Sequence, residues 1–194
     1  MMDSVVVKIG GSLLTRPGLP GRLPGWLRET FPDSQVNVVV GGGAMIEAFR
    51  QLDAIHSLDP VETHWRCVRA LRHTAEIVAG WIPDAVWVGT PASYAAHVRD
   101  SRSGDRRLGG PFVFAVDAFY GPQSGAPMPC DWSTTSDSIA AWLAIQMAAS
   151  RLVLVKSCPI PESSDLAELA SLGIVDPYLP ELSGALSVEL ATID

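Results

Sequence analysis

Short runs of consecutive apolar, β-branched residues are the feature that most constrains the fold of this chain. Continuous rather than alternating hydrophobicity is typical of strands buried on both faces, so these runs predict a parallel sheet covered by helices. Between them, apolar residues recur every three or four positions at 45–55 and 61–78, as on one face of a helix. Proline and glycine concentrate at 17–25 and 121–129, which predicts loops there. The alternation predicts an α/β sandwich. The runs lie at 5–9, 36–40, 112–116 and 152–155, with a weaker one at 85–88.

Length and composition limit the chain to one domain and exclude several classes of protein. Its 194 residues are 47% hydrophobic with a net charge of −7, so it can bury a core but lacks the basic field of nucleic-acid binding. The longest near-apolar stretch, 139–149, is well short of the roughly 20 residues that span a membrane. Three scattered cysteines predict neither a metal site nor disulfides, and we expect His56 and His97 at the surface. These features predict a cytoplasmic protein that does not bind DNA.

The first apolar run ends in a lysine, two glycines and a hydroxyl: Lys8, Gly10, Gly11 and Ser12. Glycines let backbone N–H groups approach an anion without interference from a Cβ atom, and a lysine supplies a point charge for phosphate oxygens. The motif therefore predicts a phosphate cradle, although a tight turn after a strand has the same composition. It is neither a Walker A loop nor a GxGxxG fingerprint.

A glycine triplet follows the second run. Gly41, Gly42 and Gly43 lead directly into helical spacing, which places free N–H groups and the positive end of a helix dipole at the carboxyl edge of the sheet. An anionic group is expected there. The alternative is a crowded corner between strand and helix.

The segment 131–138 precedes a helix that is apolar nearly all round. Thr135 or Ser136 is a good N-cap residue, and Asp137 at the helix start is stabilised by the dipole, so capping alone would explain it. However, an apolar helix must be buried, and burial would bring Asp137 beside the two glycine loops at the same sheet edge.

In this order, the three motifs resemble the amino acid kinase superfamily, which includes acetylglutamate, aspartate, glutamate and uridylate kinases. KxGGS follows the first strand, the glycine triplet follows the second, and Asp137 opens a helix together with Ile139 and Ala140. The resemblance implies a three-layer αβα sandwich with a mostly parallel central sheet, shortened at its C-terminal end. It also implies a single domain over 1–194, with an acceptor-side lobe over about 1–130 and a nucleotide-side lobe over about 131–194.

The same resemblance implies a phosphotransferase that moves the γ-phosphoryl group of ATP, with Mg²⁺, to a phosphate or carboxylate acceptor. Lys8 would stabilise the transferred group and Asp137 would orient Lys8 and its partners. The phosphates would be bound by Gly10, Gly11 and Ser12, and the acceptor by Gly41, Gly42, Gly43, Thr135 and Ser136.

The sequence departs from the family after the strand at 152–155. Members usually carry Thr-Asp-x-Asp-Gly there and a second lysine in a later nucleotide-binding segment, whereas this chain has Lys156, Ser157, Cys158 and Pro159. Lys156 is our candidate replacement for that lysine, with Ser157 beside it at the nucleotide. The alternative is a solvated lysine at a strand end.

The string Trp-x-x-Thr-Ser-Asp-Ser-Ile-Ala resembles a compact branch of the superfamily that contains the aminomethyl-furan-methyl phosphate kinase of methanofuran biosynthesis and lies near one-carbon metabolism. On that reading Trp132 would stack on the furan ring and Asp131 would pair with the ammonium group of the acceptor. Two alternatives stay open: a uridylate or acetylglutamate kinase-like enzyme with another acceptor, and a non-catalytic nucleotide- or anion-binding protein. A homo-oligomer, a dimer or higher, is expected.

Overall fold

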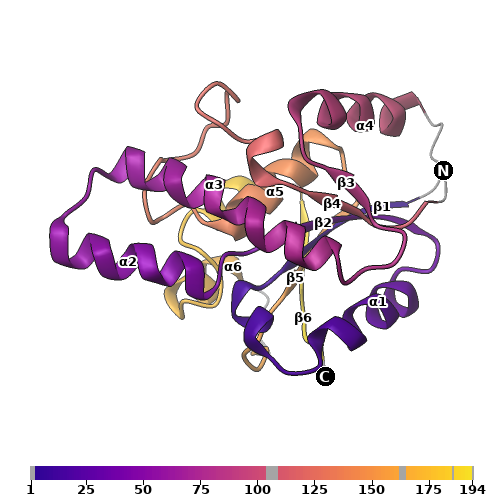
Figure 1. Cartoon of the computed structure of the whole chain (residues 1–194), viewed down its shortest axis with the longest axis horizontal. Coiled ribbons are helices and arrows are strands. Elements are labelled where there is room, and N and C mark those ends of the chain that lie inside the picture. Colours follow the sequence, from indigo (N-terminus) through magenta and orange to yellow (C-terminus); the bar gives the residue numbers. More distant parts are fainter. Residues whose placement is uncertain (1–2, 104–108, 162–164, 185, 194) are drawn as a thin grey trace.

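A six-stranded, all-parallel sheet forms the centre of the computed structural model, which describes residues 3–103, 109–161, 165–184 and 186–193 (Figure 1). The predicted runs are strands, and the run at 112–116 ends early in a turn of 3₁₀ helix, η2 (Val116–Ala118). In spatial order the strands are β3 (Val86–Val88), β4 (Phe112–Phe114), β2 (Ser34–Val40), β1 (Asp3–Ile9), β5 (Arg151–Val155) and β6 (Ser187–Ala191).

Helices cover both faces of the sheet, which gives the three-layer α/β architecture expected from the sequence (Figure 1). The predicted loop at 17–25 is wrong from residue 19 onward, because Pro20 lies in the first turn of α1, where a proline needs no hydrogen-bond partner for its nitrogen. The helical elements are η1 (Gly11–Thr15), α1 (Leu19–Thr30), α2 (Ala44–His56), α3 (Pro60–Ala79), α4 (Pro91–Ser103), α5 (Ser136–Gln146), α6 (Leu166–Ser171) and α7 (Leu179–Ser183).

Strict alternation along the strands divides the core into two clusters. In β1, Val5, Val7 and Ile9 pack on the face that α1 covers, whereas Val6 packs on the face that α5 covers. Lys8 follows Val6 by two residues and therefore lies on the α5 face. The same alternation in β5 puts Leu154 on the α5 face and leaves Lys156, just beyond the strand, in register with that face.

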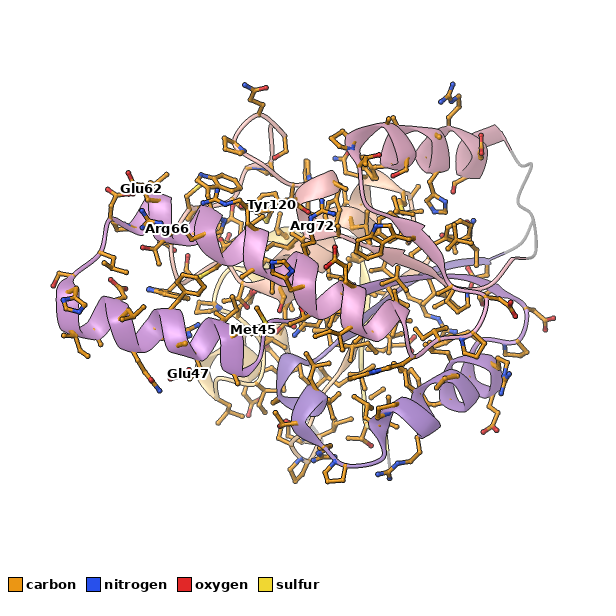
Figure 2. The ribbon with its side chains drawn as sticks, viewed as in Figure 1. Met45, Glu47, Glu62, Arg66, Arg72 and Tyr120 are labelled. Atoms are coloured by element: carbon orange, nitrogen blue, oxygen red, sulfur yellow. The ribbon has the colours of Figure 1, made fainter. Side chains whose placement is uncertain are left out.

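The α2–α3 hairpin extends away from the sheet (Figure 1). Helix α2 has the apolar stripe that its spacing predicts but no buried residue, and its Leu52 and Ile55 are 48% and 73% exposed. Figure 2 shows Glu62 and Arg66 near the outer end of α3, where they form an exposed ion pair at 2.6 Å. The hairpin thus presents both apolar and charged side chains to solvent.

One surface prediction is wrong. His97 of α4 is buried, and its Nε2 lies 2.9 Å from the amide oxygen of Asn37, itself buried in β2. Burial lowers the pKa of His97 to about 4, so the ring is neutral near pH 7. His56, in contrast, is exposed as expected. Among the described residues, no helix is both long and apolar enough to cross a membrane.

Candidate functional site

Three segments that are distant in the sequence meet at the carboxyl edge of the sheet. The loop after β1, the loop after β2 and the start of α5 are so close that a Cβ atom on Gly41 would lie 2.8 Å from Gly11 N, 3.1 Å from Ser136 Oγ and 3.3 Å from Lys8 Cε. Ligands of parallel α/β sheets bind at the carboxyl edge, in the crevice where neighbouring connections run to opposite sides of the sheet. The arrangement brings together residues from all three sequence motifs.

A buried carboxylate between two lysines forms the centre of this edge. Lys8 Nζ lies 2.8 Å from Asp137 Oδ1, and Lys156 Nζ donates a hydrogen bond of 2.7 Å to Asp137 Oδ2. The three residues are only 6%, 4% and 8% exposed, respectively. The alternative of a solvated Lys156 is therefore wrong. We call Lys8, Asp137 and Lys156 the charged triad.

The lysines of the triad are the only two in the 194-residue sequence, whose other basic side chains, apart from histidine, are arginines. Lysine has a compact ammonium that can approach a single phosphate oxygen, whereas arginine presents a broad planar fork. The exclusive use of lysine at these two buried positions, one on β1 and one after β5, marks the triad as the place where this chain requires a point charge.

Opposite charges keep Asp137 ionised despite its burial. Burial raises the pKa of the Asp137 carboxyl, but Lys8 and Lys156 outweigh that effect and hold the pKa at about 2. Burial lowers the pKa of Lys156, and Lys8 lowers it further, while Asp137 raises it. By formal charge, two lysines facing one carboxylate give the triad a surplus positive charge that can attract an anion.

The N-terminus of α5 is held by a residue that the sequence did not suggest. Thr135 is the N-cap, as the sequence allowed, but its side chain makes no capping hydrogen bond. Instead Asp176, which precedes α7, accepts hydrogen bonds from the backbone N–H groups of Thr135 and Ser138 at 2.9 and 3.0 Å. The only local signal is an Asp-Pro pair at 176–177 beside the buried Val175, which predicts a turn but not its partner.

The two glycine loops pack against each other. A Cβ atom on Gly11 would lie 2.0 Å from Gly43 N, and one on Gly43, whose φ is +54°, would lie 2.3 Å from Gly11 O. A Cβ atom on Gly10 would lie 2.7 Å from Val155 O, and one on Gly42 would lie 1.9 Å from a side-chain atom of Ile46. Close approach of the loops thus accounts for these glycines, and the crowded-corner interpretation of the triplet describes its packing.

A cavity of about 210 Å³ opens beside the triad, between the two glycine loops, the α2–α3 hairpin and the start of α5. Its wall is apolar on one side, where Ile46, Val68, Leu71 and Ile139 lie, and carries polar and charged side chains on the other. Of the sequence candidates, the cavity is lined by Gly11, Ser12, Gly42, Gly43, Asp131, Trp132, Thr135 and Ser136.

Trp132 and Asp131 already have partners within the chain. The guanidinium carbon of Arg50 lies 4.2 Å from the centre of the Trp132 ring, and Trp132 Nε1 donates a 2.7 Å hydrogen bond to Asp53 Oδ2. Asp131 is exposed and accepts hydrogen bonds from the backbone N–H and hydroxyl of Ser133. These contacts fix Trp132 as part of the cavity wall, with the cation of Arg50 on its ring.

A second, more open concavity of about 380 Å³ lies on the other side of Ser12, along the ends of β5 and β6. Ser12 Oγ is 2.6 Å from Ser157 Oγ, and Arg16 donates a hydrogen bond to the carbonyl oxygen of Ser157. Ser157 lines this second concavity, whereas Ser12 lines the first. This pair of hydroxyls therefore lies between the two concavities, and Lys156 directly precedes Ser157 in the sequence.

Solved structures of three kinases resemble the chain. Uridylate kinase from Archaeoglobus fulgidus superposes with a TM-score of 0.65 and 18% identity, over 97% of this chain and 89% of its own. UMP kinase from Ureaplasma parvum superposes with a TM-score of 0.68 and 14% identity, over 100% of this chain and 90% of its own. Aspartate kinase from Synechocystis gives 0.68 and 16%, over 97% of this chain but only 38% of its own.

The chain has the fold of UMP and aspartate kinases. At identities of 14–18% the likeness concerns the fold, and the chain spans nine-tenths of the UMP kinase from Ureaplasma parvum. Neither a protein-family model nor a curated protein matches it. The fold expected from the sequence resemblance is thus confirmed by structure, while the activity has to be argued from the site.

Proposed function

We propose that this protein is an ATP-dependent phosphotransferase whose acceptor carries a phosphate or carboxylate group. The observation that carries the proposal is the charged triad: both lysines of the chain contact one buried carboxylate at the sheet edge. Sequence neighbours of the triad line two concavities, Ser136 the first and Ser157 the second. Phosphoryl transfer requires little covalent chemistry from a protein, and mainly needs two substrates aligned and the charge on the moving group stabilised. Two lysines beside one carboxylate, with two concavities lined by residues next to them in the sequence, suit those requirements.

The proposed step forms a bond between an acceptor oxygen and the γ-phosphorus of ATP and breaks the bond from that phosphorus to the bridging oxygen, whose electron pair leaves with ADP. Lys8 and Lys156 would stabilise the charge on the transferred group and the leaving oxygen. Asp137 would hold both ammonium groups in place, a task for which its own ionisation at every pH above about 2 is suited. No general base is needed, because the acceptor is already an anion.

The donor set suits phosphate rather than a bare metal ion. Both oxygens of Asp137 are paired with lysines, and the described residues contain no group of three or more His, Cys, Asp or Glu side chains that could hold a metal. Magnesium would therefore be held mainly by the phosphates of ATP, where it neutralises their charge. Gly10, Gly11 and Ser12, with Ser157 across the hydroxyl pair, would contact the phosphates through backbone N–H and hydroxyl groups.

The cavity beside α2 is our proposed acceptor site. Gly42 and Gly43 precede a helix of 13 residues, and the backbone N–H groups of Gly42, Gly43 and Ala44 would bind the acceptor anion close to Lys8. The apolar wall and the Trp132 ring suit a flat ring, and the exposed carboxylate of Asp131 suits an amine. Thr134 supplies a buried hydroxyl oxygen without a hydrogen-bond partner among the described residues. These features support an aminomethyl-furan-methyl phosphate acceptor and a place near one-carbon metabolism.

Two further points of the proposal concern alternatives and assembly. Titles of the similar structures name UMP and aspartate kinases, so UMP and aspartate are the comparison acceptors. A binder without transfer activity is disfavoured by Asp137, because a carboxylate beside two lysines weakens anion binding. The exposed apolar side chains of Leu52 and Ile55 on α2 support the expected homo-oligomer.

The experiment measures ADP formation and phosphorylated product with ATP, Mg²⁺ and a panel of small phosphates and carboxylates. We expect Lys8→Met to lower kcat about 10²–10³-fold, as for loss of one preorganised donor at a transition state. Arg151→Met is the matched control, since Arg151 begins the same strand that Lys156 follows, but at the opposite sheet edge, and it should leave kcat unchanged. ATP binding without transfer to any acceptor would favour the non-catalytic alternative.

A further inference from the structure

Asp176 makes more hydrogen bonds than a helix start needs. Its Oδ2 accepts from the backbone N–H and the hydroxyl of Thr135, both at 2.9 Å, and from Ser138 N at 3.0 Å. Its Oδ1 accepts from the hydroxyl of Ser138 at 2.5 Å and from Leu179 N at 3.1 Å. Asp176 is 6% exposed, so a buried carboxylate with five donors closes the end of α5.

The residues that Asp176 binds flank Asp137 in the sequence. Thr135 and Ser138, the two residues that Asp176 binds, lie on either side of Asp137 in the first turn of α5. The carboxylate also occupies the positive end of the helix dipole, where it is stabilised and where a substrate anion would otherwise be favoured. The start of α5 therefore holds Asp137 in the triad. The N–H groups that would bind an anion belong to the glycine loops.

Asp176 also contributes charge to the triad. Lys156 contacts Asp137 directly, whereas Lys8 from β1 and Asp176 from the turn before α7 act on its pKa through their charges. Asp176 is bound to the helix start that carries Asp137, so its carboxylate lies at the start of the same helix as the partner of Lys156. With Asp176 included, two lysines and two carboxylates are buried here, and buried charges are tolerated when they are paired and hydrogen-bonded.

We propose that Asp176 is a positioning residue for phosphoryl transfer: it fixes the turn that carries Asp137, and through that helix start it adds a second negative charge that acts on Lys156. The inference rests on the proposed function, which assigns the transfer step to the triad, and adds a residue that lies outside all three sequence motifs. Asp176 itself contacts no substrate in this proposal. It acts through Asp137 and Lys156.

The same charges predict how Asp176→Asn changes the dependence of kcat on pH. Burial and Lys8 lower the pKa of Lys156, while Asp137 and Asp176 raise it. Removing the charge of Asp176 therefore lowers the pKa of Lys156 further. Because Lys156 assists transfer only while protonated, the alkaline limb of the kcat profile should move to lower pH in Asp176→Asn.

The test compares Asp176→Asn with Asp165→Asn. Asp165 is an exposed N-cap that accepts from Ala167 N and Glu168 N at the start of α6, so its variant reports on the loss of a carboxylate charge at a helix start outside the triad. In Asp176→Asn we expect kcat to fall at least tenfold, the KM values of donor and acceptor to change less than threefold, and the alkaline limb to move down by at least half a pH unit. Asp165→Asn should show none of these changes.

A spectroscopic readout separates this inference from the proposed function. Because the chain has only two lysines, selective isotope labelling gives two side-chain amine signals, whose titration is followed by NMR without any substrate. The Lys156 signal should titrate at lower pH in Asp176→Asn than in the wild type. If the wild type transfers no phosphoryl group, the proposed function fails, and this titration still decides the charge role of Asp176.

Ser138→Ala keeps the test decisive where Asp176→Asn does not fold. It removes one hydrogen bond to Asp176 and keeps the charge, so kcat should fall at least threefold with the alkaline limb unmoved. A wild-type kcat in Ser138→Ala and Asp176→Asn would overturn the positioning role. A lowered kcat with an unmoved limb and unmoved Lys156 titration in Asp176→Asn would reduce Asp176 to a structural cap and also overturn the proposal.

Discussion

From the charged triad we predict changes in the free energy of unfolding that can be tested without an activity assay. Asp137→Asn leaves two buried ammonium groups without their carboxylate, and removal of one partner from a buried ion pair costs about 3–5 kcal/mol. Lys156→Met leaves the neutral pair of Lys8 and Asp137 intact and removes the need to bury a second cation. We expect that variant to lose about 1 kcal/mol or less.

The double variant gives the magnitude of the coupling. At the observed 2.7 Å between Lys156 Nζ and Asp137 Oδ2, unit charges attract by about 6 kcal/mol at an effective dielectric constant of 20. Proton release by Lys156 and solvent entry offset much of this in Asp137→Asn. We therefore expect the double variant Asp137→Asn/Lys156→Met to be more stable, by about 2 kcal/mol, than the sum of the two single losses.

Urea unfolding of the four proteins measures this coupling, with the slope of the transition checked for two-state behaviour. The exposed pair of Arg151 and Glu189, at 3.2 Å, supplies a matched control cycle with Arg151→Met and Glu189→Gln. Exposed pairs contribute about 0.2–1 kcal/mol, so this coupling should be much smaller. Additivity within about 0.5 kcal/mol for Asp137 and Lys156 would refute the buried triad.

Three further predictions concern the loops, acid stability and the cavity. Gly11→Ala should destabilise the protein by about 2–4 kcal/mol, because its Cβ would meet the backbone of Gly43. Gly25→Ala in the interior of α1, where a Cβ atom would have nothing within 4 Å, should stabilise the protein by about 0.5–1 kcal/mol. Equal thermal shifts of the two variants would contradict the packing of the loops. Because the pKa of Asp137 is lowered from 3.8 to about 2, the ionised carboxylate stabilises the folded protein at pH values above 3.8, and this stabilisation is lost as the pH falls toward 2. In urea unfolding between pH 5 and 2, the wild type should therefore lose about 2 kcal/mol of unfolding free energy that Asp137→Asn does not lose. Trp132→Ala should raise the KM of the acceptor more than that of ATP in steady-state kinetics, and the reverse would assign this wall to the nucleotide.

Much of the sheet follows from continuous apolar runs, which located five of the six strands. The alternation of side chains along a strand places Lys8 on the face of Val6 and Lys156 on the face of Leu154, the face that α5 covers. That both lysines contact Asp137 depends in addition on where α5 begins above the sheet. β6 was not predicted from the sequence, because it is an edge strand in which the exposed Glu189 interrupts the apolar run.

The remainder of the site depends on contacts between segments that carry no local signal for each other. The role of Asp176 at α5 requires a partner 41 residues away, and a lone Asp-Pro pair predicts only a turn. The glycines appeared suited to phosphate, but their packing shows a second constraint, the close approach of two loops. Trp132 similarly has Arg50 on its ring, a pairing that sequence spacing does not reveal.

A crystal structure of the chain with Mg²⁺ and a non-hydrolysable ATP analogue would decide whether the charged triad is the place of phosphoryl transfer. We expect a γ-phosphate oxygen within hydrogen-bond distance of Lys8 Nζ or Lys156 Nζ, with the cavity beside Trp132 open on the far side of the γ-phosphorus for an acceptor. A nucleotide whose phosphates lie away from both lysines, with the triad closed as it is here, would contradict it.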